Sequence, residues 1–240
     1  MRALLPTSDV VVIVDVLSFS TAVDVAVSRG AQILPYPYGQ ESAAGYAEAH
    51  DAVLAQPRAA RGGQLSLSPQ SLNSVAAATR IVLPSPNGSM LSRETGSLPT
   101  LAGCLRNASA VARAALHLGR SIAVIAAGER WLDDSLRPAI EDLLGAGAIV
   151  DRIGGLPSPD AEAMRAGYAA LQGRIASVIQ ESQSGEELSG AGFAGDVAVA
   201  VEEDVSAATP LLQEMAYHDA ALAAPGASSR PASALDTQNA

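Results

Sequence analysis

The sequence predicts an α/β protein of three layers, α/β/α, in which a mixed and largely parallel sheet lies between helices. The chain opens with an apolar run, a helical pattern, a second strand-like segment and a second helical pattern, and this alternation favours parallel strands. With 240 residues, 48% of them hydrophobic, folding would bury roughly 70% of the surface of the unfolded chain. We therefore expect a substantial core that needs no disulfide.

The first elements follow from local patterns. Val10–Val14 is continuous and β-branched, which is typical of a strand buried on both faces. Ser18 or Ser20 is suited to cap the helix expected at Ala22–Arg29, and Gly30 is suited to end it. A second strand over residues 31–35 and a helix over residues 41–55 complete the opening.

The rest of the chain continues the alternation as far as about residue 150. We expect strands at residues 81–83, 98–104 and 121–127, and helices at residues 108–118, 136–150, 158–179 and 195–204. In the helix at 136–150, a buried stripe is expected at Leu136, Ile140, Leu143 and Leu144. Gly145 and Gly147 in the same helix indicate close packing. We expect one domain over residues 1–222 and a disordered tail, rich in Ala, Pro, Ser and Gly, over residues 223–240.

Charge and composition exclude several classes of function. The formal net charge is -10, and all 15 cationic residues are arginine, so a nucleic-acid-binding face or a basic membrane surface is not expected. The apolar run at Val10–Val14 is too short for a secretory signal or a membrane helix. The single cysteine, Cys104, excludes an intrachain disulfide. We expect a cytoplasmic protein.

Three loops that follow predicted strands carry polar residues. In the first, Asp15–Thr21, a carboxylate lies beside a hydroxyl-rich helix start, which suits a hard cation next to a phosphate but equally suits a simple helix cap. In the second, Pro84–Ser89, the Asn87-Gly88 pair and Ser89 suit either an anion-binding nest or a tight turn with positive φ.

The third region holds Glu129, Arg130 and the pair Glu141-Asp142. Adjacent helix residues point about 100° apart, so we expect one member of this pair to face a ligand and the other to be solvated. Because the chain contains no lysine, a phosphate clamp would fall to arginine; the candidates are Arg61, Arg106 and Arg130.

Several segments together resemble the 2-phosphosulfolactate phosphatases (ComB-like proteins). They are Val12–Thr21, Arg61-Gly-Gly63, Asn87–Ser89, Arg106–Ala108 and residues 136–149, in the family's order, with a looser match at Gly192–Asp196 and Glu203-Asp204. The resemblance implies a magnesium-dependent hydrolase that releases phosphate from 2-phospho-3-sulfolactate on the way to coenzyme M. It also implies a homo-oligomer.

Carried over by position, the resemblance implies roles in the site for Asp15, Ser20, Thr21, Asn87, Gly88, Asn107, Glu141 and Asp142. We expect Asp15, Glu141 and Asp142 to be catalytic, and Asp15 to bind Mg²⁺ with Glu141 or Glu129. The expected substrate-binding residues are Ser20, Thr21, Arg61, Asn87, Gly88, Ser89, Arg106 and Asn107. In one departure from the family, Ser18 stands where an arginine usually follows Val-Leu, which weakens the case for a substrate with both phosphate and sulfonate.

Two mechanisms remain open at this point. In the first, the metal polarises the phosphoryl group and a carboxylate positions the attacking water. In the second, Asp15 itself becomes phosphorylated. A non-catalytic anion-binding or regulatory protein on the same fold is the alternative to an enzyme.

Overall fold

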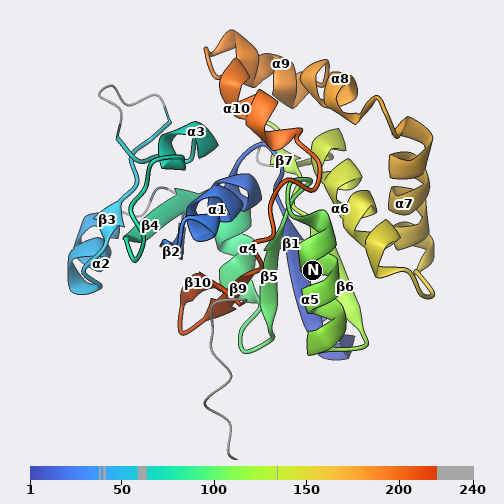
Figure 1. Cartoon of the computed structure of the whole chain (residues 1–240), viewed down its shortest axis with the longest axis horizontal. Helices are drawn as coiled ribbons and strands as arrows, with labels where there is room; N and C mark the ends of the chain where they lie inside the picture. The colour runs from blue at the N-terminus through green and yellow to red at the C-terminus, as the bar shows by residue number, and fades with distance from the viewer. Residues whose placement is uncertain (38, 40–41, 59–63, 134, 221–240) are drawn as a thin grey trace, which may run out of the picture.

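The computed structural model describes residues 1–37, 39, 42–58, 64–133 and 135–220 (Figure 1). Its main sheet has the strand order β3-β4-β2-β10-β9-β5-β1-β6, and β7 pairs with β8 in a separate hairpin. The strands are β1 Val10–Val14, β2 Gln32–Pro37, β3 Val53–Leu54, β4 Arg80–Ser85, β5 Thr100–Gly103, β6 Ile122–Ala126, β7 Glu129–Arg130, β8 Leu136–Arg137, β9 Pro210–Gln213 and β10 Ala216–Asp219. With helices on both faces, this mixed and mostly parallel sheet confirms the predicted α/β fold.

Two parallel halves make up the sheet. Strands β3, β4 and β2 are parallel to one another, as are β5, β1 and β6. The hairpin β9–β10 joins the halves through antiparallel pairs with β5 and β2. This hairpin was not predicted from the sequence.

The helices are α1 Phe19–Ser28, α2 Ala43–Ala49, α3 Pro69–Leu72, α4 Gly88–Glu94, α5 Ala108–Leu118, α6 Ile140–Ile153, α7 Pro159–Leu171, α8 Ile175–Gln180, α9 Gln183–Gly190 and α10 Ala194–Ala200, preceded by the 3₁₀ turn η1 Leu5–Thr7. None of the helices in the described part of the chain combines the length and apolar character needed to span a membrane.

Some predicted boundaries were wrong. The helix expected over residues 41–55 ends at Ala49, because Asp51 adopts a positive φ of 50° and the chain then enters β3. The helix expected over residues 158–179 is divided into α7 and α8 around Gly173, whose φ is 82°. The predicted tail, residues 223–240, lies outside the described residues.

Helix α6 also differs from its prediction. It starts at Ile140, because Leu136 and Arg137 form β8 against β7. The expected buried stripe was wrong as well: Leu136 is 62% exposed and Ile140 38% exposed, whereas Leu144 is buried.

The two glycines of α6 lie where this helix packs closely against its neighbours. A Cβ on Gly145 would lie 2.6 Å from Val16 Cγ2, and one on Gly147 would lie 2.2 Å from the Met164 carbonyl oxygen. These contacts confirm the expected close packing. They place Gly145 against the end of β1 and Gly147, on another side of the helix, against α7.

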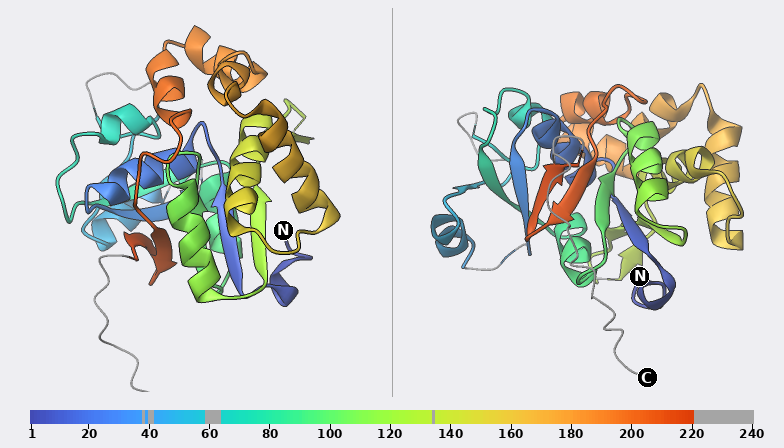
Figure 2. Two further views of the ribbon diagram at one scale, coloured as in Figure 1. Left: turned by 45° about the vertical axis from the view of Figure 1, so that its right-hand side comes forward. Right: turned by 60° about the horizontal axis from the view of Figure 1, so that its bottom comes forward.

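The parallel strand β1 runs toward the end of the molecule where β7 and the helices α8–α10 lie (Figures 1 and 2). All five residues of β1 are buried. Because its carboxyl end carries Asp15, the loops at this end of the sheet form the candidate site.

Candidate active site

Asp15 lies at the carboxyl end of β1 and is 4% exposed. Its Oδ1 accepts a hydrogen bond from the Phe19 amide at 3.1 Å, and its Oδ2 accepts one from the Gly88 amide at 3.0 Å. The carboxylate therefore joins the starts of α1 and α4.

Burial, and then the charge of Glu129, raises the pKa of Asp15 to about 7, although the two amides and Arg58 oppose the rise. A negative charge at Asp15 is thus costly, and a cation bound beside it would relieve that cost.

Ser20 and Thr21 hold the loop between β1 and α1. Ser20 Oγ accepts a hydrogen bond from the Asp15 amide at 3.1 Å and donates one to the Ile13 carbonyl at 2.9 Å. Thr21 Oγ1 donates to the Val16 carbonyl at 2.6 Å. Both side chains are fully buried, so their hydroxyl groups serve the backbone, and this placement does not favour the substrate contact expected of them.

Asn87 and Gly88 bring the loop after β4 to Asp15. Asn87 Nδ2 donates to Glu129 Oε2 at 3.1 Å, and a Cβ on Gly88 would lie 2.3 Å from Phe19 Cδ1. Asn87 has a φ of -109°, so the expected turn with positive φ is not formed here. Glycine is required at position 88 because any side chain there would clash with the Phe19 ring. Ser89 Oγ donates to the Leu83 carbonyl at 2.8 Å and is fully buried, which does not favour contact with a ligand.

Two more carboxylates continue from Asp15. Glu129, on β7, has a raised pKa because it is partly buried and lies near Glu141, while Asn87 and Arg137 oppose the rise. Glu141 is 2% exposed, and no described residue donates a hydrogen bond to it. A buried carboxylate without a donor is suited to receive a cation or a water molecule.

Asp142 has a different environment from its neighbour. Its Oδ1 accepts from the Val16 amide at 2.7 Å and its Oδ2 from the Gly128 amide at 2.9 Å. The side chain thus ties the β1–α1 loop to the loop after β6. Because both Glu141 and Asp142 are buried, the expectation that one of them is solvated was wrong.

Of the arginines expected to clamp phosphate, Arg106 is engaged by other partners. Arg106 Nε donates to Asp24 Oδ2 at 2.9 Å, and its Nη1 contacts Glu202 and the Val199 carbonyl. Arg130 lies on the exposed part of β7. Arg61 lies outside the described residues.

Asn107 has a local role. Its Oδ1 accepts from the Cys104 amide at 2.9 Å, its Nδ2 donates to the Ala102 carbonyl, and it is fully buried. These bonds close the turn between β5 and α5, and they do not favour the substrate contact expected of this residue.

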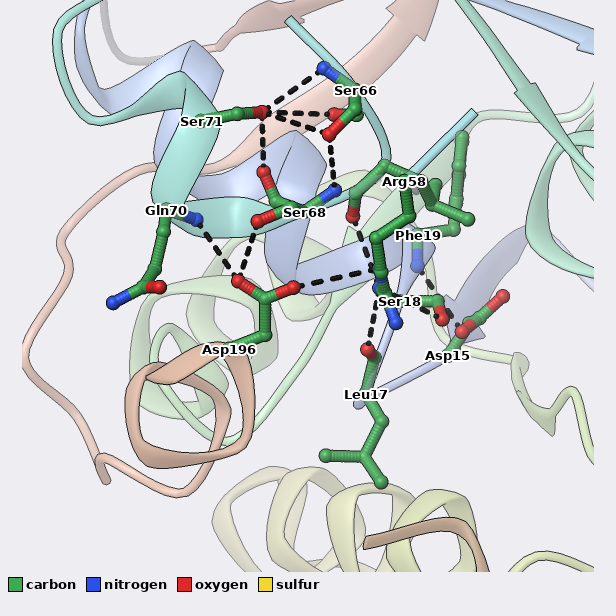
Figure 3. Close-up of polar contacts among 11 residues, drawn as sticks. Asp15, Leu17, Ser18, Phe19, Arg58, Ser66, Ser68, Gln70, Ser71 and Asp196 are labelled. Atoms are coloured by element: carbon green, nitrogen blue, oxygen red, sulfur yellow. Dashed lines mark hydrogen bonds and ion pairs between the residues drawn. The ribbon is translucent and has the colours of Figure 1, made fainter. Parts of the chain in front are cut away.

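Arg58 is a cation whose charge opposes the rise in the pKa of Asp15, and it was not predicted from the sequence. Figure 3 shows its guanidinium between Asp196, on α10, and the Leu17–Ser18 turn. Nε lies 3.4 Å from Asp196 Oδ2, and Nη2 donates to the Leu17 carbonyl at 3.1 Å and to Ser18 Oγ at 3.4 Å. Arg58 follows a short strand in an irregular segment, so no local pattern marked it.

The carboxylates around Asp15 are candidate ligands for a magnesium ion. Among the described residues, no three His, Cys, Asp or Glu side chains are placed to enclose a metal by themselves. Mg²⁺ is usually bound by one or two carboxylates together with waters and substrate oxygens, so it needs no such enclosure. Asp15 and Glu129, whose pKa values are both raised and whose charges interact, fit that requirement, and Glu141 lies next to Glu129.

Comparison with known proteins gives two matches. Residues 3–215 match the family described as 2-phosphosulpholactate phosphatase. A curated relative, the 2-phosphosulfolactate phosphatase of Methanothermobacter thermautotrophicus strain Delta H, is 30% identical over 218 residues, which cover 86% of this chain and 88% of that protein.

Proposed function

We propose that this chain, which belongs to the 2-phosphosulpholactate phosphatase family and is a phosphoric monoester hydrolase, hydrolyses 2-phosphosulfolactate to sulfolactate and phosphate with the help of Mg²⁺. The observation that carries the proposal is the buried Asp15 carboxylate at the end of β1, held by two loop amides beside Glu129. In the cell, the product would serve the formation of coenzyme M.

Asp15 and Glu129 would hold the metal, and Glu141 would complete its outer surroundings. When bound, Mg²⁺ would neutralise charge on the phosphoryl oxygens and orient the ester. The protein's own task is then to fix the carboxylates. The Phe19 and Gly88 amides fix Asp15, and Asn87 fixes Glu129.

For the chemical step, we infer attack by water on phosphorus. The bond from phosphorus to the ester oxygen breaks as the bond to the water oxygen forms, and the ester oxygen leaves with sulfolactate and takes up a proton to become its hydroxyl group. Glu141 is suited to orient that water and take its proton, because it is buried and receives no hydrogen bond from the described residues. Asp15 is less suited as a nucleophile, since each of its oxygens already accepts an amide hydrogen bond. Rapid-quench mass spectrometry should detect no phosphorylated Asp15, and a trapped phosphoenzyme would contradict this mechanism.

Five buried polar side chains would stabilise the loops of the site without contacting substrate: Asp142, Ser20, Thr21, Ser89 and Asn107. Their polar atoms bond to backbone groups of the loops, so they would set loop geometry without touching substrate. Arg106 would likewise stabilise the packing of α1 on α10 through Asp24 and the Val199 carbonyl.

The direct test is phosphate release from 2-phosphosulfolactate, 2-phospholactate and 3-phosphoglycerate, each in Mg²⁺ and in EDTA. The proposal expects metal-dependent release that is fastest from 2-phosphosulfolactate. Release only from an ester without a sulfonate would show that the protein is a phosphatase with a different substrate. If no phosphate were released although the anions still bound, the protein would be a non-catalytic anion-binding protein and not an enzyme.

A further inference from the structure

We propose that Arg58 binds an acid group of the substrate other than the phosphoryl group, and so selects esters that carry a second strong acid. This inference rests on the proposed function, because it assigns a cation to the same site. The phosphoryl group would lie at Asp15 and Glu129, and the second acid group beside the Leu17–Ser18 turn.

The anchoring of Arg58 is the first argument. The guanidinium contacts Asp196 through Nε and the Leu17 and Leu67 carbonyls through Nη2, the latter at 3.1 and 3.2 Å. The contact of Nε with Asp196 Oδ2 is an ion pair without a hydrogen bond, and no described residue accepts a hydrogen bond from Nη1. One edge of the guanidinium is thus fixed, and Nη1 keeps donors for a ligand.

The position of Arg58 is the second argument. It donates to Ser18 Oγ at the start of α1 and not to the Asp15 carboxylate. Its charge nevertheless acts on both Asp15 and Glu129. A substrate whose phosphoryl group lies at those carboxylates would therefore reach Arg58 with an acid group a few bonds away.

Charge balance is the third argument. A substrate with two or three acid groups enters a site lined by Asp15, Glu129 and Glu141, in a chain with net charge -10. A divalent metal offsets the phosphoryl group but leaves the other acid groups without a cation. Among the described arginines whose charge acts on these carboxylates, Arg137 is paired with Glu187, whereas Arg58 acts on both Asp15 and Glu129.

Asp196 would be the positioning residue for this arginine. It is 1% exposed, and its Oδ1 accepts from Ser68 Oγ at 2.5 Å and from the Gln70 amide at 3.5 Å. These bonds direct Oδ2 toward Arg58 Nε, as Figure 3 shows. Helix α10 and the segment before α3 thereby set where the guanidinium lies.

The test measures the binding of each of the two reaction products separately. Calorimetry in Mg²⁺ would measure the binding of sulfolactate, which lacks the phosphoryl group, and of inorganic phosphate, which is that group alone. For Arg58→Gln, sulfolactate affinity should fall about 30-fold, the effect of losing a charged hydrogen bond, while phosphate affinity should stay within about threefold. Arg58→Lys should recover part of the sulfolactate affinity.

Arg152→Gln is the matched control. Arg152 is also a partly buried arginine paired with an aspartate, with Nη2 at 2.6 Å from Asp204 Oδ2, but it contacts Tyr168 and Ser109 away from this site. The control should change neither affinity. Asp196→Asn should raise the KM for 2-phosphosulfolactate about fivefold with little change in kcat, because it releases the arginine without removing it.

Equal weakening of both ligands by Arg58→Gln, or no change in either, would overturn the inference. If Arg58→Gln failed to fold, Arg58→Lys and Asp196→Asn would decide in the same way, on sulfolactate against phosphate. Wild-type protein that released no phosphate from 2-phosphosulfolactate would overturn the proposed function and this inference with it. Hydrolysis by wild type, with sulfolactate affinity intact in Arg58→Gln, would overturn the inference alone.

Discussion

Asp15→Asn should stabilise the metal-free protein, and more so as the pH rises. The pKa of Asp15 is raised from 3.8 to about 7 in the folded state, so the folded chain binds a proton that the unfolded chain releases more readily. The stabilisation that protonated Asp15 contributes to the folded state is complete below pH 3.8, and it is lost progressively as the pH rises to about 7. Between pH 5 and pH 8 the loss is roughly 2 to 3 kcal/mol.

Asparagine does not titrate, so the difference in unfolding free energy between Asp15→Asn and wild type should grow by that amount over the same interval. The assay is urea unfolding of both proteins in EDTA at pH 5 and pH 8. Losing one amide hydrogen bond to Asp15 would shift both values by about 1 kcal/mol without changing the growth. A difference independent of pH would show that the pKa of Asp15 is not raised in the folded protein. Mg²⁺ should reduce the difference at pH 8 if it binds this carboxylate.

Three further predictions concern the surroundings of Asp15. Asp142→Ala should lower the unfolding free energy by about 2 to 5 kcal/mol, because it leaves the two buried amides of Val16 and Gly128 without acceptors; unchanged urea unfolding would contradict its supporting role. Gly88→Ala should reduce phosphate release at least tenfold, because the added Cβ would displace Phe19 and, with it, Asp15; wild-type turnover would show that the loop can move aside. Glu129→Gln should raise the Mg²⁺ concentration needed for half-maximal phosphate release about tenfold or more, and an unchanged metal titration would remove Glu129 from the metal site.

Local patterns predicted the framework of the sheet. Continuous β-branched residues mark β1, and the polar residues that follow it mark the loop with Asp15. The prediction failed where strand pairing overrides the local helical pattern. Leu136 and Arg137 continue a helical pattern, yet they pair with Glu129 and Arg130 as a hairpin.

Part of the site could also be predicted from the sequence. Asp15, Asn87, Glu129 and Glu141 lie near one another because parallel strands end at one edge of the sheet. Sequence alone could not show that both oxygens of Asp142 accept backbone amides. Nor could it show that α10 brings Asp196 to Arg58, since these residues lie far apart in the chain and neither belongs to a local motif.

Steady-state phosphate release from 2-phosphosulfolactate, by wild type and by Asp15→Asn, tests the central claim most directly. We expect release by wild type in Mg²⁺, and loss of that release in EDTA with recovery on adding Mg²⁺. In Asp15→Asn we expect release to fall about a thousandfold or more, despite the greater stability of this variant without metal. Turnover by Asp15→Asn at the wild-type rate, or wild-type turnover unaffected by EDTA, would contradict that claim.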